Sequence, residues 1–229
     1  MRLLITGPPG AGKGTQASAL AERYAIPAIS SGDIFRDNIK RHTPLGDRVV
    51  EIIARGDFVP DVLTTSLVFQ RIIEPDCRRG WLLDGYPRTA AQVEALDIAL
   101  AETGTALDAV IALVADPEVL VARMLKRAQE QGRDDDNADS IRHRIEVYHA
   151  QTADVIALYR DRGIVLDVDA IGSVDEVRER IFAAVDGWIN GSTPDAIRGT
   201  VFSTYGWCIG ASAVLGQMLL VWQDGMAAG

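Results

Sequence analysis

The stretch that most constrains this chain is GPPGAGKGT, residues 7–15, which lies between an apolar run at 2–6 and a helical pattern at 13–24. A short apolar run ending at glycine is typical of a buried parallel strand. Glycines let the backbone curl so that several N–H groups point at one anion, and the following helix adds its positive end. This order predicts a nucleotide-phosphate site with Lys13 neutralising charge; the alternative is a turn with an incidental lysine.

The residue after the lysine narrows the kind of loop. The general phosphate-loop motif has Ser or Thr directly after the lysine as a magnesium ligand. This chain has Gly14 there and carries the hydroxyl one residue later, at Thr15. The loop therefore predicts a magnesium ion held mostly by phosphates, water and a remote carboxylate. Asp84, which ends the apolar run WLLD, is the natural carboxylate; the alternative is an ordinary turn aspartate.

Three further apolar runs indicate the fold class. They are WLLDG (81–85), AVIALV (109–114) and IVLDVD (164–169), and helical patterns separate them, among them residues 117–131. Strands that alternate with helices predict a parallel, doubly wound α/β sheet.

The composition limits the class of ligand. The chain of 229 residues suits one large domain or a domain with appendages, and it is 48% hydrophobic. Its 23 Lys and Arg against 32 Asp and Glu give a formal net charge of −9. Nucleic-acid binding needs a basic surface, so no nucleic-acid partner is expected, and an anionic ligand requires cations concentrated in one site.

The cysteines and the N-terminus predict the compartment. Cys77 and Cys208 are far apart and form no CxxC pair, so neither a disulfide framework nor a zinc site is expected. The starting sequence MRLLITG has too short an apolar run for a signal peptide. A reducing cytoplasm is the expected location.

Five motifs together resemble the nucleoside monophosphate kinases, and most closely the bacterial adenylate kinases, over residues 1–188. The motifs occur in the order and spacing of that family: GPPGAGKGTQA (7–17), ISSGDIFR (29–36), GDFVP (56–60), LLDGYPRTAAQ (82–92) and GRDDD (132–136). The resemblance implies a P-loop NTPase-like fold and a monomeric enzyme. It also implies reversible transfer of the terminal phosphoryl group of ATP to AMP, giving two ADP, with Mg²⁺ as cofactor.

The resemblance also implies the site residues. The implied catalytic residues are Lys13, Arg88, Arg123, Arg133 and Arg144. The implied ATP contacts are Gly10, Ala11, Gly12, Lys13, Gly14, Thr15, Arg127 and Gly172. The implied AMP contacts are Ser31, Arg36, Asp57, Phe58, Val59, Gly85, Tyr86, Pro87, Arg88, Gln92, Arg133 and Arg144. Asp84 is implied to hold Mg²⁺ through water. Arginines suit phosphoryl transfer because their planar forks grip phosphate oxygens in two places.

Several of these residues have ordinary alternatives when they are taken singly. Arg123, Arg127 and Arg144 are also consistent with solvated helix faces. Gln92 is consistent with an exposed helix position, and Gly172 with a plain turn.

The resemblance divides the kinase domain into moving parts. Residues 30–59 are expected to form a helical AMP-binding insertion, with Ser31 as a helix N-cap. Residues 127–137 are expected to form a short lid, which lacks cysteine and so carries no zinc. Both are expected to close over the nucleotides and exclude water. Asp135 and Asp136 are expected to hold lid arginines; a solvated acidic loop is the alternative.

The C-terminal extension, residues 189–229, lies outside the resemblance. A linker-like stretch (191–199) precedes an uncharged hydrophobic segment (200–223), which is long enough to span a bilayer but is diluted by Gly, Ser, Thr and Gln. Three interpretations stay open: an extension without function, which ranks first, a membrane anchor, or a helix that packs on the core or on a partner. Membrane contact is expected only if this segment inserts.

Two alternatives to an adenylate kinase stay open at this point. One is a kinase for another monophosphate, such as CMP or UMP. The other is a nucleotide-binding module without turnover, which the number of arginines converging on the phosphates argues against.

Overall fold

A parallel sheet organises the chain, of which the computed structural model describes residues 1–131 and 138–192. The strand order is β2-β3-β1-β4-β5, and all the strand pairs are parallel. The strands are β1 (Arg2–Thr6), β2 (Ala28–Ser30), β3 (Trp81–Asp84), β4 (Ala109–Val114) and β5 (Val165–Asp169). The predicted doubly wound α/β class is confirmed. The edge strand β2 was not predicted, because three residues are too few to show a pattern.

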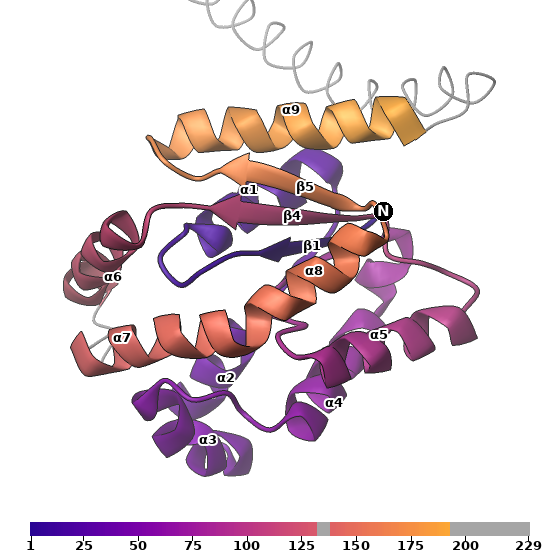
Figure 1. Cartoon of the computed structure of the whole chain (residues 1–229). Helices are drawn as coiled ribbons and strands as arrows, with labels where there is room; N and C mark the ends of the chain where they lie inside the picture. The colour runs from indigo at the N-terminus through magenta and orange to yellow at the C-terminus, as the bar shows by residue number, and fades with distance from the viewer. Residues whose placement is uncertain (132–137, 193–229) are drawn as a thin grey trace, which may run out of the picture. The chain divides into compact units, whose positions relative to one another are not determined.

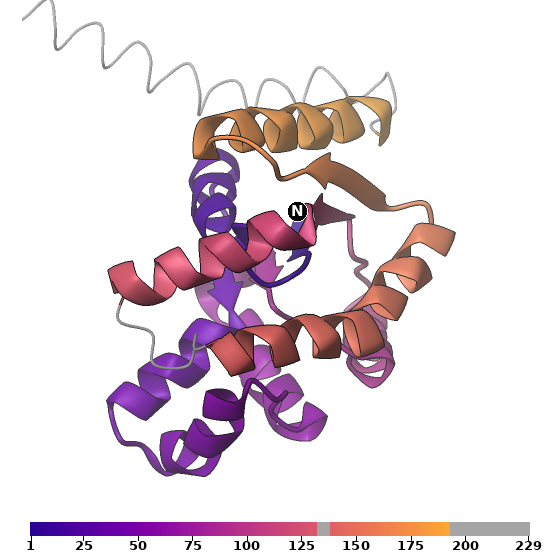
Figure 2. The same cartoon turned by 60° about the vertical axis from the view of Figure 1, so that its left-hand side comes forward.

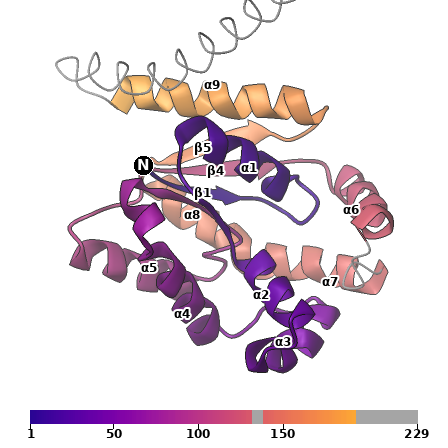
Figure 3. The ribbon, with the colours of Figure 1, turned by 180° about the vertical axis from the view of Figure 1, so that it is seen from behind.

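The helices are α1 (Lys13–Tyr24), α2 (Ser31–Lys40), α3 (Pro44–Arg55), α4 (Asp61–Ile72), α5 (Ala90–Glu102), α6 (Pro117–Gln131), α7 (Ala138–Val147), α8 (Ala153–Asp161) and α9 (Val174–Ser192), with a 3₁₀ helix η1 (Pro75–Arg79) and a π-helical turn η2 (Tyr148–Thr152). Helices α1 and α8 lie on opposite faces of the sheet, as Figure 1 and the view from behind in Figure 3 both show. In Figure 2, α6 (pink) and the run of α7 and α8 (salmon) are two separate helical segments. Residues Met1–Ala184 form one compact unit.

The strand order creates a switch point at β1. The chain runs from β1 to β2 and β3 on one side and then crosses to β4 and β5 on the other. Leu4 of β1 is in register with Leu83 of β3 and Val110 of β4. Ligands of open α/β sheets bind beyond the carboxyl ends of the strands at such a point.

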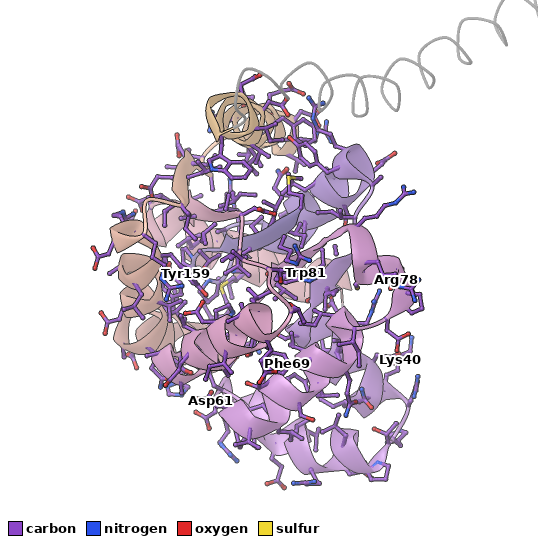
Figure 4. The ribbon with its side chains drawn as sticks, turned by 90° about the vertical axis from the view of Figure 1, so that its right-hand side faces the viewer. Lys40, Asp61, Phe69, Arg78, Trp81 and Tyr159 are labelled. Carbon is purple, nitrogen blue, oxygen red and sulfur yellow. The ribbon has the colours of Figure 1, made fainter. Side chains whose placement is uncertain are left out.

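One core cluster lies between the sheet and helices α5 and α8. Leu83 and Val110 from the strands pack in one buried cluster with Leu96 of α5 and Tyr159 of α8. Figure 4 labels Tyr159 together with Trp81, another member of this cluster. Dense apolar packing of this kind holds the strands whose ends carry the site.

A second, smaller core holds the α2–α3 region. Phe35 of α2 and Val49 of α3 pack with Val59 in a buried cluster of their own. Helix α3 lies away from the strands in both Figure 1 and Figure 3, whereas α2 contacts β3. Both helices fall within residues 30–59, the region predicted to form the AMP-binding insertion.

The N-cap of α2 differs from the prediction by one residue. The Ser30 side chain caps the helix by accepting a hydrogen bond from the Asp33 N–H at 3.2 Å, so the assignment of the cap to Ser31 was wrong. Ser31 is instead the first helical residue, and its hydroxyl donates to the Gly85 carbonyl at 2.8 Å. An N-cap residue needs extended backbone, and Ser30 has this conformation whereas Ser31 is already helical.

Replacing Leu96 with Ala tests the core cluster between the sheet and helices α5 and α8. Leu96 is 0% exposed, so the variant leaves a cavity and is expected to lose about 2–5 kcal/mol of unfolding free energy. Ile98→Ala on the same helix is the control, because Ile98 is 55% exposed and its loss is expected within about 0.5 kcal/mol. Urea denaturation followed by circular dichroism measures both, and equal losses would contradict the packing described.

Candidate active site

A cavity of about 820 Å³ lies beyond the carboxyl ends of β1, β3 and β5. Its lining includes these predicted site residues: Gly10, Ala11, Gly12, Lys13, Gly14, Thr15, Ser31, Arg36, Asp57, Phe58, Val59, Asp84, Gly85, Tyr86, Pro87, Arg88, Gln92, Arg123, Arg144 and Gly172. Arg127 lies in α6, but its side chain is not among those described, and Arg133 lies outside the described residues. The fold therefore brings every described candidate side chain to one place.

Glycines shape the loop between β1 and α1. Gly7 has a φ of 142°, and a Cβ there would lie 2.7 Å from the Leu113 carbonyl oxygen, so no other residue fits. Gly12, the N-cap of α1, has a φ of 88°, and a Cβ there would meet nothing within 4 Å. Its backbone conformation needs glycine, while the space beside the helix N-terminus stays open for an anion.

Lys13 folds back over this loop. Its ammonium donates hydrogen bonds to the carbonyls of Gly7 at 2.8 Å and Pro8 at 3.0 Å. These two bonds hold a positive charge at the mouth of the loop. An anion in the loop would therefore meet both the backbone N–H groups of the helix start and the ammonium.

Asp84 lies buried, 8% exposed, at the end of β3. Burial raises the pKa of its carboxyl group, while the positive charges of Lys13 and Arg88 oppose that rise. The Asp84 Oδ2 atom lies 3.8 Å from where a Cβ of Gly14 would be. That distance is an ordinary van der Waals contact, so position 14 lies beside this carboxylate but the local space does not by itself require glycine.

The sequence interpretation missed Asp33 of α2. Its carboxylate lines the cavity, and its charge contributes to raising the pKa of Asp84, so the two carboxylates lie near one another. It also accepts a hydrogen bond from the Arg36 Nη2 atom at 2.6 Å. The motif ISSGDIFR contained the residue, but an acid in a first helical turn is equally typical of a helix that stabilises its own dipole.

Three guanidinium groups lie at the cavity, and their charges act on one another. Arg88 donates from Nε to the Gly85 carbonyl at 2.8 Å, and its guanidinium carbon lies 4.9 Å from the centre of the Phe58 ring. Burial lowers the pKa of Arg88, Asp84 raises it, and the like charges of Arg144 and Arg36 lower it further. Such like charges are favourable together only with an anion between them.

Gln92 is buried, 2% exposed, which excludes the exposed-helix alternative. Its side-chain oxygen accepts from the Arg88 backbone N–H at 2.7 Å, and its amide nitrogen donates to Asp61 Oδ1 at 2.6 Å. Thr89 donates to the other oxygen of Asp61 at 2.8 Å. No sequence pattern pointed to Asp61, because its partners are about thirty residues away along the chain.

Helix α7 reaches the insertion through a polar contact. His143 Nε2 lies 2.7 Å from Asp57 Oδ1, while Arg55 Nε donates to Asp57 Oδ2 at 3.0 Å. The hydrogen bond from His143, followed by that from Arg55, lowers the pKa of Asp57. Arg144, the next residue of α7, donates to the Ile53 carbonyl at 3.4 Å. The loop after α3 and helix α7 are thus joined at the cavity.

Arg123 of α6 lies against the loop between β5 and α9. Its two terminal nitrogens donate to the carbonyls of Ala170 at 2.9 Å and Gly172 at 3.2 Å. Lys126 also lines the cavity and was missed, although its spacing of three from Arg123 places the two on one helix face. This end of the cavity therefore combines backbone carbonyls with two cations.

The described residues bear on part of the predictions about a metal site and a membrane-spanning segment. Among residues 1–131 and 138–192, no group of three or more His, Cys, Asp or Glu side chains is placed to hold a metal ion. Within the same ranges, no helix has both the length and the apolar character to cross a membrane. The hydrophobic segment 200–223 and the acidic residues Asp135 and Asp136 lie outside the described residues.

Asp57→Asn tests the contact between α7 and the insertion. Because the folded pKa of Asp57 lies below its ordinary value of 3.8, the carboxylate stabilises the fold above that pH and this contribution is lost as the pH falls further. The variant is expected to lose less than about 1 kcal/mol at pH 7, since the group is partly exposed. Urea titrations should show that the difference in unfolding free energy between the variant and the wild type vanishes at acidic pH.

Asp37→Asn is the matched control for that experiment. Asp37 lies in α2 and forms an exposed ion pair with Arg41, one turn further along the chain. This pair, unlike the Asp57–His143 contact, does not connect two segments that are distant in sequence. A pH-independent loss in Asp57→Asn, equal to that of the control, would contradict the assigned contact.

Comparison with known proteins gives consistent matches. The family model described as "Adenylate kinase" matches residues 5–164. An adenylate kinase of Clavibacter michiganensis subsp. michiganensis is 57% identical over 186 residues, which cover 81% of this chain and 93% of that protein. One from Kocuria rhizophila is 56% identical over 185 residues, covering 81% and 98%. One from Leifsonia xyli subsp. xyli is 56% identical over 183 residues, covering 80% and 92%.

Proposed function

Because this chain belongs to the adenylate kinase family, it is an ATP:AMP phosphotransferase, and we propose that the cavity described above carries out the transfer. The observation that carries the proposal is the gathering of cations in one cavity of an acidic chain. The glycine loop with Lys13 lines this cavity, and so do Arg36, Arg88 and Arg144. Two anionic nucleotides can thus meet among these positive charges.

The proposed reaction needs positioning and charge neutralisation rather than a covalent intermediate. The triphosphate of ATP binds the loop N–H groups and Lys13, and the AMP phosphate binds the three arginines. An oxygen of the AMP phosphate attacks the γ-phosphorus while the bond from that phosphorus to the β,γ-bridging oxygen breaks, which gives two ADP. The attacking oxygen is already ionised, so no general base is needed.

The proposed Mg²⁺ site uses two carboxylates that line the cavity. The charge of Asp33 acts on Asp84, and Mg²⁺ prefers oxygen ligands with several retained waters. We propose that Asp84 holds the ion through water, with Asp33 beside it. The bound ion would neutralise charge on the phosphates of ATP.

The base of AMP is proposed to lie beside Phe58, Val59 and Gln92, which line the cavity next to Arg88. The resemblance of the whole motif set supports AMP over CMP or UMP as acceptor. Ser31, bonded to Gly85, keeps the hydroxyl that the family has at this position.

The remaining proposals concern the domain boundaries of the enzyme, its oligomeric state and its location in the cell. The kinase domain is proposed to span residues 1–188, with the insertion at 30–59 and the lid at 127–137 closing over AMP and ATP. The protein is proposed to be a cytoplasmic monomer, which its two separated cysteines and the resemblance support. Membrane contact is proposed only if residues 200–223 insert.

Arg88→Ala tests the acceptor-phosphate side. Loss of a half-buried guanidinium that meets the phosphate is expected to lower kcat/KM for AMP about 10²–10³-fold in a coupled assay. Arg78→Ala is the control, because Arg78 is exposed, does not line the cavity, and is labelled in Figure 4. Near-normal turnover by Arg88→Ala, in a protein that still unfolds cooperatively, would reject the assigned role.

An acceptor panel tests the choice of nucleotide. With ATP as donor, kcat/KM for AMP is expected to exceed that for CMP or UMP by at least about tenfold, because a site built to hydrogen-bond one base leaves polar groups unpaired with another. A preference for CMP would overturn the assignment of the acceptor, and binding of ATP with no transfer to any monophosphate would favour the non-catalytic module.

A further inference from the structure

The loop between β5 and α9 has its backbone carbonyls held by side chains from other elements. Arg123 of α6 binds the carbonyls of Ala170 and Gly172, at 2.9 and 3.2 Å. Arg180 of α9 binds those of Asp169 and Ile171, at 2.8 and 2.6 Å. The loop lines the cavity, and side chains from two helices help to hold its conformation.

The same segment begins α9 with a capping box. The Ser173 backbone N–H donates to Glu176 Oε2 at 2.8 Å, and the Glu176 N–H donates to Ser173 Oγ at 3.3 Å. This reciprocal pair fixes the point at which the helix starts. The loop is thus tied to α6 and to α9.

A third tie comes from the phosphate-loop helix itself. Gln16 lies in the first turn of α1, lines the cavity and is 3% exposed. Its Nε2 atom donates to the Val174 carbonyl at 2.9 Å, across 158 residues of sequence. Because a carbonyl can only accept, the amide must present its nitrogen to Val174, which fixes the orientation of the side chain.

That orientation carries a cost. The Oε1 atom of Gln16 is buried and has no hydrogen-bond partner. An unsatisfied buried acceptor lowers the stability of the fold, and an apolar side chain of similar size would avoid the loss. The Val174 carbonyl does not depend on Gln16, since it lies in the first turn of α9 within reach of a helical N–H. The contact is therefore poorly explained by stability alone.

We propose that Gln16 is a positioning residue that fixes the loop carrying Gly172 relative to the loop that binds the triphosphate. This inference rests on the proposed function, with Gly172 contacting ATP as the family resemblance implies. The tie sets the span from the phosphate site to the nucleoside site, so it acts on ligands that occupy both. A ligand that fills only the phosphate site does not use it.

Gln16→Met tests this span, because methionine keeps the length of the side chain and removes the hydrogen bond. Calorimetric titration of the full-length protein is expected to show affinity for ATP reduced about three- to tenfold, and affinity for inorganic tripolyphosphate within twofold of wild type. In steady state, KM for ATP should rise by the same factor, with kcat and KM for AMP unchanged. The melting temperature should be equal to that of wild type or higher, since the orphaned oxygen is gone.

Ser18→Ala is the matched control, because Ser18 is exposed on the same helix and bonds only the Gly14 carbonyl, at 3.2 Å. It is expected to leave both affinities unchanged. Three results for Gln16→Met would overturn the proposal. They are an equal loss of affinity for ATP and for tripolyphosphate, an unchanged affinity for ATP, and a lowered melting temperature with a parallel loss of affinity for both nucleotides. Failure of the wild type to transfer phosphate to AMP would instead reject the proposed function, because the binding measurements need no turnover.

Discussion

The arrangement of the site depends on the burial of one carboxylate. A buried charge is tolerated only where opposite charge or hydrogen bonds compensate it. Asp84 ends β3, and the register that pairs it with Ile5 brings it level with the end of β1. Lys13 from the loop after β1 and Arg88 from the turn after β3 both act on this carboxylate. The sheet register therefore sets how far the loop after β1 lies from the turn after β3.

The cations that bind phosphate are drawn together although the whole chain is acidic. A formal charge of −9 spreads over the surface, while Arg36, Arg88 and Arg144 come from three different parts of the sequence to one wall of the cavity. Each is supported by a local contact, such as the Phe58 ring beneath Arg88. Local support lets like charges stay close before an anion arrives, which is the preorganisation that phosphoryl transfer requires.

Sequence patterns predicted the parts of the fold that depend on local physics. The apolar runs predicted β1, β3, β4 and the whole of β5, and the motifs predicted the residues of the phosphate loop. Patterns could not give Gln16, Asp33 or Asp61, since a polar residue shows no sign in sequence of whether folding will bury it against a distant partner. The same limit explains why Ser31, rather than Ser30, was expected to cap α2: both precede the helix, and only the backbone conformation separates them.

The small core of Phe35, Val49 and Val59 is separate from the cluster that packs between the sheet and helices α5 and α8. Separately packed clusters can open with different free energies, and a cluster with fewer buried apolar contacts is the less protected. Backbone amide hydrogens around the small core are therefore expected to exchange with solvent sooner than those of the strands that carry the phosphate loop. The partition of the buried hydrophobic residues thus lets the α2–α3 region move while the strands stay ordered.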